Sequence, residues 1–116
     1  MDFSGTTDIS NNDFQLITYN IPPGKLTLYL YSQDQSQFLT FGNGFRCIGS
    51  PLFRVQPAVN ADSFGQVFYP LNLNTLPSGG QILAGQSWGF MAWYRDPPAG
   101  GAFFNGSDAL STTWCP

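Results

Sequence analysis

The side chains that enzymes use most for acid–base chemistry are scarce in this chain. Its 116 residues contain no histidine, and its seven acidic residues are all aspartates, beside one lysine and three arginines. General acid–base catalysis and nucleophile activation draw mainly on His, Glu, Lys and Cys. No spacing among the aspartates places two carboxylates across a cleft, as glycoside hydrolysis requires. The sequence therefore predicts a protein that is not an enzyme.

Aromatic residues make up 16% of the chain and are its groups best suited to binding. In residues 25–32, Leu28 and Leu30 alternate with Tyr29 and Tyr31. Successive side chains of a strand point to opposite faces of the sheet. If the leucines form the core, the two tyrosines face outward and make a flat platform.

A second aromatic candidate lies in residues 87–95, where Trp93 and Arg95 share one face of a predicted strand. Sugar rings have apolar C–H faces and hydroxyl rims, which suit exposed Tyr or Trp beside polar groups. We therefore take Tyr29, Tyr31, Trp93 and Arg95 as the candidate ligand-binding residues. The alternative is that the tryptophans fill the space between two sheets, as in other sandwiches.

Asp96, Asn105 and Asp108 border the loop between the last two predicted strands. Ca²⁺ takes carboxylate and amide oxygens as ligands, so these residues are a candidate calcium site, although no calcium-binding spacing motif accompanies them. The alternative is an ion pair between Arg95 and Asp108. No other metal or cofactor is expected.

The chain contains two cysteines, Cys47 and Cys115. Disulfides are common in exported proteins, and a charge-poor chain rich in Gly and Pro fits that class. We therefore expect a disulfide between Cys47 and Cys115 that fixes the last strand. The alternative is a pair of buried thiols.

The net charge is −3, and the four cationic residues are dispersed along the sequence at Lys25, Arg46, Arg54 and Arg95. Because they form no basic stripe, nucleic acid is not an expected partner. No apolar run approaches the roughly 20 residues needed to cross a bilayer, so no membrane span is expected. Abundant Asn, Gln, Ser and Thr favour an extracellular or cell-surface protein that meets polar ligands.

Short β-favouring runs recur between clusters of Gly, Pro, Asn and Asp, and helical spacing is nearly absent. This pattern predicts an all-β fold, an immunoglobulin-like β-sandwich of about seven or eight antiparallel strands, or a jelly-roll-like variant of it. Asn43-Gly44 marks a tight hairpin turn, and Pro70 indicates an edge strand or a bulge. The expected strands are 14–19, 25–32, 38–41, 45–48, 52–55, 65–73, 87–95 and 108–114.

A chain of this length fits one domain, which we place at residues 1–116. Residues 1–4 lack the basic start and the apolar segment of a signal peptide. We interpret them as an added start or a linker, and the chain as one module of a larger exported protein.

Three segments give the chain a resemblance to a known module. They are residues 45–49 (FRCIG), 88–96 (WGFMAWYRD) and 104–111 (FNGSDALS). Their order resembles that of the β-sandwich domain found near the C-termini of large secreted proteins of environmental bacteria, from about residue 5 to the end. The resemblance implies a sandwich and secretion. It carries over no catalytic residue, because that family is largely uncharacterised.

Together these observations predict a secreted, non-catalytic accessory module that binds polysaccharide through exposed aromatic side chains, in the manner of a carbohydrate-binding module. The alternative is a structural or adhesive surface domain that packs against copies of itself or against neighbouring domains of the same protein.

Overall fold

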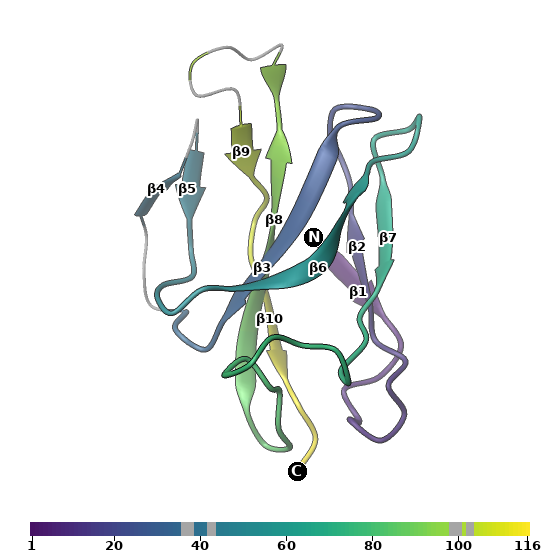
Figure 1. Ribbon diagram of the computed structural model, residues 1–116, viewed down its shortest axis with the longest axis vertical. Helices are drawn as coiled ribbons and strands as arrows, with labels where there is room; N and C mark the ends of the chain where they lie inside the picture. Colours follow the sequence, from purple (N-terminus) through teal and green to yellow (C-terminus); the bar gives the residue numbers. More distant parts are fainter. Residues whose placement is uncertain (36–38, 42–43, 98–100, 102–103) are drawn as a thin grey trace.

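The computed structural model describes residues 1–35, 39–41, 44–97, 101 and 104–116 (Figure 1). These residues form ten strands and no α-helix, so none of them belongs to a helix that could span a membrane. The strands are β1 (Asp2–Ser4), β2 (Gln15–Thr18), β3 (Leu26–Ser32), β4 (Leu39–Phe41), β5 (Gly44–Arg46), β6 (Phe53–Asn60), β7 (Val67–Pro70), β8 (Ser87–Arg95), β9 (Phe104–Gly106) and β10 (Leu110–Thr113).

Two antiparallel sheets pack against each other and enclose the main core (Figure 1). The first sheet has the order β1-β2-β7. The second has the order β10-β8-β3-β6, and β9 pairs with the C-terminal end of β8. A separate hairpin, β4–β5, lies beside β9. Eight of the ten strands thus belong to the two packed sheets, which confirms the predicted all-β sandwich and its number of strands.

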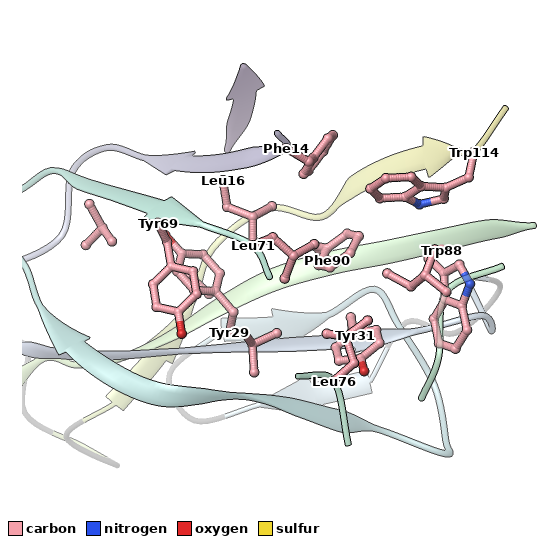
Figure 2. Packing of buried hydrophobic residues seen from close by; sticks show 14 of the residues in the cluster. Phe14, Leu16, Tyr29, Tyr31, Tyr69, Leu71, Leu76, Trp88, Phe90 and Trp114 are labelled. Carbon is pink, nitrogen blue, oxygen red and sulfur yellow. The ribbon is translucent and has the colours of Figure 1, made fainter. Parts of the chain in front are cut away.

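The main core lies between the two sheets and is rich in aromatic rings (Figure 2). Trp88 and Phe90 of β8 pack against Tyr31 with ring centroids 5.2 and 5.4 Å away. Phe14, which precedes β2, packs against Trp114 at 5.0 Å. Trp88 and Trp114 are therefore core residues, as the alternative interpretation of the tryptophans expected.

The prediction that Tyr29 and Tyr31 face outward is wrong. Both side chains are buried, with exposures of 1% and 0%, and both belong to the main core. Leu28 and Leu30 lie on the opposite face of β3, where they form a second, smaller core with Ile48. Both faces of β3 are covered, so the alternation identified the strand but not the side on which the larger core lies.

The hydroxyl groups of these two tyrosines form hydrogen bonds inside the core. Tyr29 shares a hydrogen bond of 2.6 Å with the Thr18 hydroxyl, and Tyr31 donates one of 2.6 Å to the carbonyl oxygen of Gly80. Burial raises the pKa of each tyrosine to about 12. Because the phenols are paired within the protein, they are not free to bind a ligand.

The segment after β5 covers the outer face of the five-stranded sheet. The Gly49 N–H donates to the carbonyl oxygen of Asp34 at 2.8 Å, and Ile48 is fully buried. Beneath this segment lies Gly89 of β8, where a Cβ atom would come within 2.8 Å of Ile48 and 2.9 Å of Gln35. The missing side chain of Gly89 therefore lets the segment approach the sheet closely.

The predicted disulfide is absent, since Cys47 and Cys115 are both free thiols. Cys47 precedes Ile48 in the segment that covers the outer face of the five-stranded sheet. Cys115 follows β10, and its N–H donates to the carbonyl oxygen of Thr7, just after β1 in the other sheet. The two cysteines are therefore held by elements on different sides of the five-stranded sheet.

Some details of the strands agree with expectation and others differ from it. Residues 2–4, interpreted as a start or linker, form β1 and pair with β2. Pro70 ends β7, an edge strand, as its missing N–H indicated. The expected strand 108–114 is shortened to β10, and β9 lies before it. The predicted Asn43-Gly44 turn falls partly outside the described residues.

Candidate functional site

A pocket opens on the outer face of the five-stranded sheet, beside β5 and β9. Its volume of about 330 Å³ is near the lower end of the range for small-molecule sites, roughly 300–1,000 Å³. Five strands and the loop before β6 contribute to its wall. The described residues that line it are Leu30, Arg46, Leu52, Arg54, Trp93 and Phe104.

Strand register brings the pocket residues to one face of the sheet. Leu30 of β3 lies opposite Arg54 on β6 and opposite Met91 on β8. Residues directly opposite each other in neighbouring strands share a face, and Leu30 faces outward because the tyrosines of β3 occupy the inner face. Arg54 and Met91 therefore face outward as well, and so does Trp93, two residues further along β8.

Trp93 forms the aromatic wall of the pocket. Its ring is half-buried and meets Phe104 edge to face, with centroids 5.8 Å apart and an interplanar angle of 85°. Its Nε1 atom is buried and has no hydrogen-bond partner among the described residues. The indole N–H groups of Trp88 and Trp114 both donate to side-chain oxygens. Of the three tryptophans, Trp93 is the one whose N–H has no partner among the described residues.

Arg46, at the end of β5, supplies a second open donor. Its Nε atom is buried, and it too lacks a hydrogen-bond partner in the part of the chain that the structure describes. A buried donor without an acceptor costs about 1–3 kcal/mol. Arg46 and Trp93 both line the pocket, and each has a buried N–H without a partner among the described residues.

Three of the four cationic side chains gather around Trp93. Arg46 and Arg54 line the main pocket, and Arg95 lines a smaller one, of about 30 Å³, that shares Trp93 with it. The cations are dispersed in the sequence, but the fold collects them. None of these three arginines forms an ion pair with another described residue. The described lining of the main pocket contains no acidic side chain.

The structure brings together half of the predicted ligand-binding set. Trp93 and Arg95 lie on the outer face, next to each other at the smaller pocket. Tyr29 and Tyr31 lie in the main core on the other face of the sheet. The sequence analysis missed the two arginines of the main pocket, whose proximity depends on pairing between distant strands.

The three residues of the candidate calcium site have separate surroundings. Asn105 accepts a hydrogen bond of 2.9 Å from the next backbone N–H. Asp108 forms an ion pair of 2.7 Å with the N-terminal amino group rather than with Arg95. Burial, and then the nearby Asp96 carboxylate, raise the pKa of Tyr94. Within the described residues, no three His, Cys, Asp or Glu side chains lie close enough together to hold a metal ion.

A comparison of the chain with protein-family models finds no match, and neither does a comparison with curated proteins or with solved structures. No residue role is therefore carried over from another protein. The pocket offers its own chemistry: an aromatic wall, two leucines and two arginines.

Proposed function

We propose that the chain is a non-catalytic carbohydrate-binding domain and that its site is the pocket beside Trp93. The observation that carries the proposal is the presence, in one pocket, of an indole ring and two arginine side chains, which can donate hydrogen bonds. A sugar has an apolar C–H face that packs on an indole ring and oxygen atoms that accept hydrogen bonds. A bound sugar would meet both features at once.

The packing of Trp93 suits a binding platform. The ring is held by its edge-to-face contact with Phe104, while part of its surface stays accessible. Leu30 and Leu52 add apolar surface to the same pocket. A ring that is already fixed loses little conformational freedom when a ligand binds, so more of the contact energy appears as affinity.

The residue types in the pocket favour binding over bond cleavage. Its described lining contains no aspartate, and the whole sequence contains neither histidine nor glutamate. The two arginines stay protonated in proteins and therefore do not act as general bases. This inventory supports a domain that holds a polysaccharide without hydrolysing it.

Affinity electrophoresis through gels that contain neutral or acidic polysaccharides tests the proposal. Trp93→Ala should lose retardation, because the variant lacks the platform. Tyr19→Ala is the matched control, since Tyr19 is 46% exposed and follows β2 in the other sheet. It should be retarded like the wild type. Retardation by no polymer, or equal retardation of wild type and Trp93→Ala, would contradict the proposal.

A second candidate function is self-association or docking to a neighbouring domain. It is favoured by two exposed rings near the edge of the three-stranded sheet, Phe64 at 81% and Phe68 at 51% exposure. Sedimentation velocity over a range of concentrations tests it. A concentration-dependent oligomer that Phe68→Ser abolishes would support this function, and a monomer at every concentration would rule out self-association.

A further inference from the structure

We infer that the ligand of this pocket is an acidic polysaccharide, whose carboxylate or sulfate group is held by Arg46 and Arg54 while a sugar ring packs beside Trp93. The inference rests on the proposed carbohydrate-binding function and adds the charge of the ligand to it. All three residues line the same pocket of about 330 Å³.

Arg46 and Arg54 give the pocket positive charge that no described group neutralises through an ion pair. Two guanidinium groups that line one small pocket attract an anion together. The described residues supply no such anion, because neither arginine has an ion pair among them and none of those lining the pocket is acidic. The chain as a whole carries a charge of −3, so this positive pocket is a local feature.

The guanidinium groups of Arg46 and Arg54 supply hydrogen-bond donors to the pocket. An ionised carboxylate accepts through two oxygens with about four lone pairs and has no proton of its own to place. A guanidinium group bonds carboxylates and other oxyanions through pairs of parallel hydrogen bonds, which are shorter and stronger than neutral ones. An oxyanion therefore uses these donors better than a neutral hydroxyl group does.

The position of Arg95 favours a polymer over a single sugar as the ligand. Arg95 shares the smaller pocket with Trp93, while Arg46 and Arg54 share the larger one. A chain with an acidic group on successive sugar units can place one group in the larger pocket and direct another toward Arg95. The indole ring of Trp93, which borders both pockets, would lie beneath the sugar between them.

The test compares polymers that differ only in charge. Wild-type protein is run through gels that contain polygalacturonate, its methyl ester, a sulfated galactan, or the same galactan after desulfation. We expect retardation by polygalacturonate or by the sulfated galactan, and weak or no retardation by the two uncharged counterparts. Comparing the two acidic polymers distinguishes carboxylate from sulfate. Retardation should weaken as NaCl rises from about 50 to about 500 mM, because salt screens the charges.

Variants connect the charge preference to the pocket. Arg54→Gln and Arg46→Gln should each weaken binding to the acidic polymer on the order of tenfold or more, because each removes a charge that faces the anion. Lys25→Gln, which removes a cation that lines neither pocket, should bind like the wild type. Trp93→Phe keeps a ring of smaller area, so it should bind the acidic polymer more weakly than the wild type. Circular dichroism shows whether Arg46→Gln folds. If it does not, Arg54→Gln still tests the inference, because Arg54 is exposed and its replacement leaves the core unchanged.

The outcomes separate this inference from the function on which it rests. Equal binding of charged and uncharged polymers, abolished by Trp93→Ala, would overturn the acidic ligand and leave carbohydrate binding in place. Binding to none of the four polymers would overturn the acidic ligand. If no neutral or acidic polysaccharide in the gels that test the proposed function retards the protein, carbohydrate binding is overturned too. Equally strong binding to a DNA duplex would overturn the inference, because the pocket would then select charge alone.

Discussion

Tyr31 and Trp93 lie on neighbouring strands of one sheet but have opposite roles. Tyr31 is fully buried, stacks on Phe90 and donates a hydrogen bond to the carbonyl oxygen of Gly80. Trp93 lies on the other face, half-buried, with its N–H unpaired among the described residues. The sequence identifies both as aromatic residues in strands, but the surroundings decide which one packs and which one can bind.

The buried position of Tyr31 predicts a stability effect without a binding effect. Tyr31→Phe leaves the Gly80 carbonyl without its donor and should lower the free energy of unfolding by about 1–3 kcal/mol. Tyr31→Ala should cost about 3–5 kcal/mol. Tyr19→Phe, an exposed control, should stay within about 0.5 kcal/mol of the wild type. Urea denaturation measures all three, and a Tyr31→Ala variant that is fully stable but no longer binds polysaccharide would contradict the buried placement.

The raised pKa of the two core tyrosines predicts a loss of stability in alkali. Burial raises the pKa of Tyr29 and Tyr31 from 10.0 to about 12, because the interior disfavours the charged phenolate. The folded state therefore holds these protons more tightly than the unfolded state does. Their contribution is fully present below about pH 10 and is lost as pH rises towards about 12. Urea titrations across this range should show a smaller decrease for the Tyr29→Phe/Tyr31→Phe variant, and an identical decrease would count against the mechanism.

At the scale of elements, sequence patterns identified most strands but could not say which faces are buried. The alternation in residues 25–32 is present in β3, and Pro70 lies at a sheet edge as expected. Which face of β3 meets the main core depends on the segment around Ile48, which covers the leucine face. The segment around Ile48 is distant from residues 25–32 in the sequence, so the alternation in those residues does not predict its position.

The close approach of this covering segment predicts the effect of a single methyl group. Gly89→Ala would place a Cβ within 2.8 Å of Ile48 and should destabilise the domain by about 1–3 kcal/mol. Ile48→Ala removes one of the two side chains that the new methyl group meets, the other being Gln35. In thermal or urea denaturation, the double variant should therefore lose less stability than the sum of the two single variants. Strict additivity would mean that the two residues do not touch.

At the scale of the whole molecule, strand pairing creates the candidate site. Arg46, Arg54 and Arg95 are dispersed in the sequence, and composition gave no reason to group them. Cross-strand register and the hairpin beside β9 bring them around Trp93. Trp93 and Arg95 could be predicted from one strand, whereas the pocket arginines required knowledge of which strands are neighbours.

The positions of the cysteines predict that oxidation contributes nothing to stability. Cys115 is exposed and Cys47 is partly buried, and both are free. A thiol reagent added to the native protein without reductant should therefore label two groups, Cys115 faster than Cys47. The thermal midpoint should not change when a reductant is added. A native mass lower by two hydrogens, with no reactive thiol, would mean that the two sulfurs are joined.

The central claim, that ligand binds beside Trp93, is tested most directly by the indole N–H resonances of the three tryptophans in a nitrogen–proton correlation spectrum. The indole N–H groups of Trp88 and Trp114 are hydrogen-bonded inside the protein, and the N–H of Trp93 has no partner among the described residues. The Trp93 resonance is assigned by its loss in Trp93→Phe. Titration with oligogalacturonate should shift this resonance and leave the other two in place. If the gels show binding to the sulfated galactan instead, a sulfated oligosaccharide is the titrant. A saturating titration that leaves the Trp93 resonance unmoved would contradict the account.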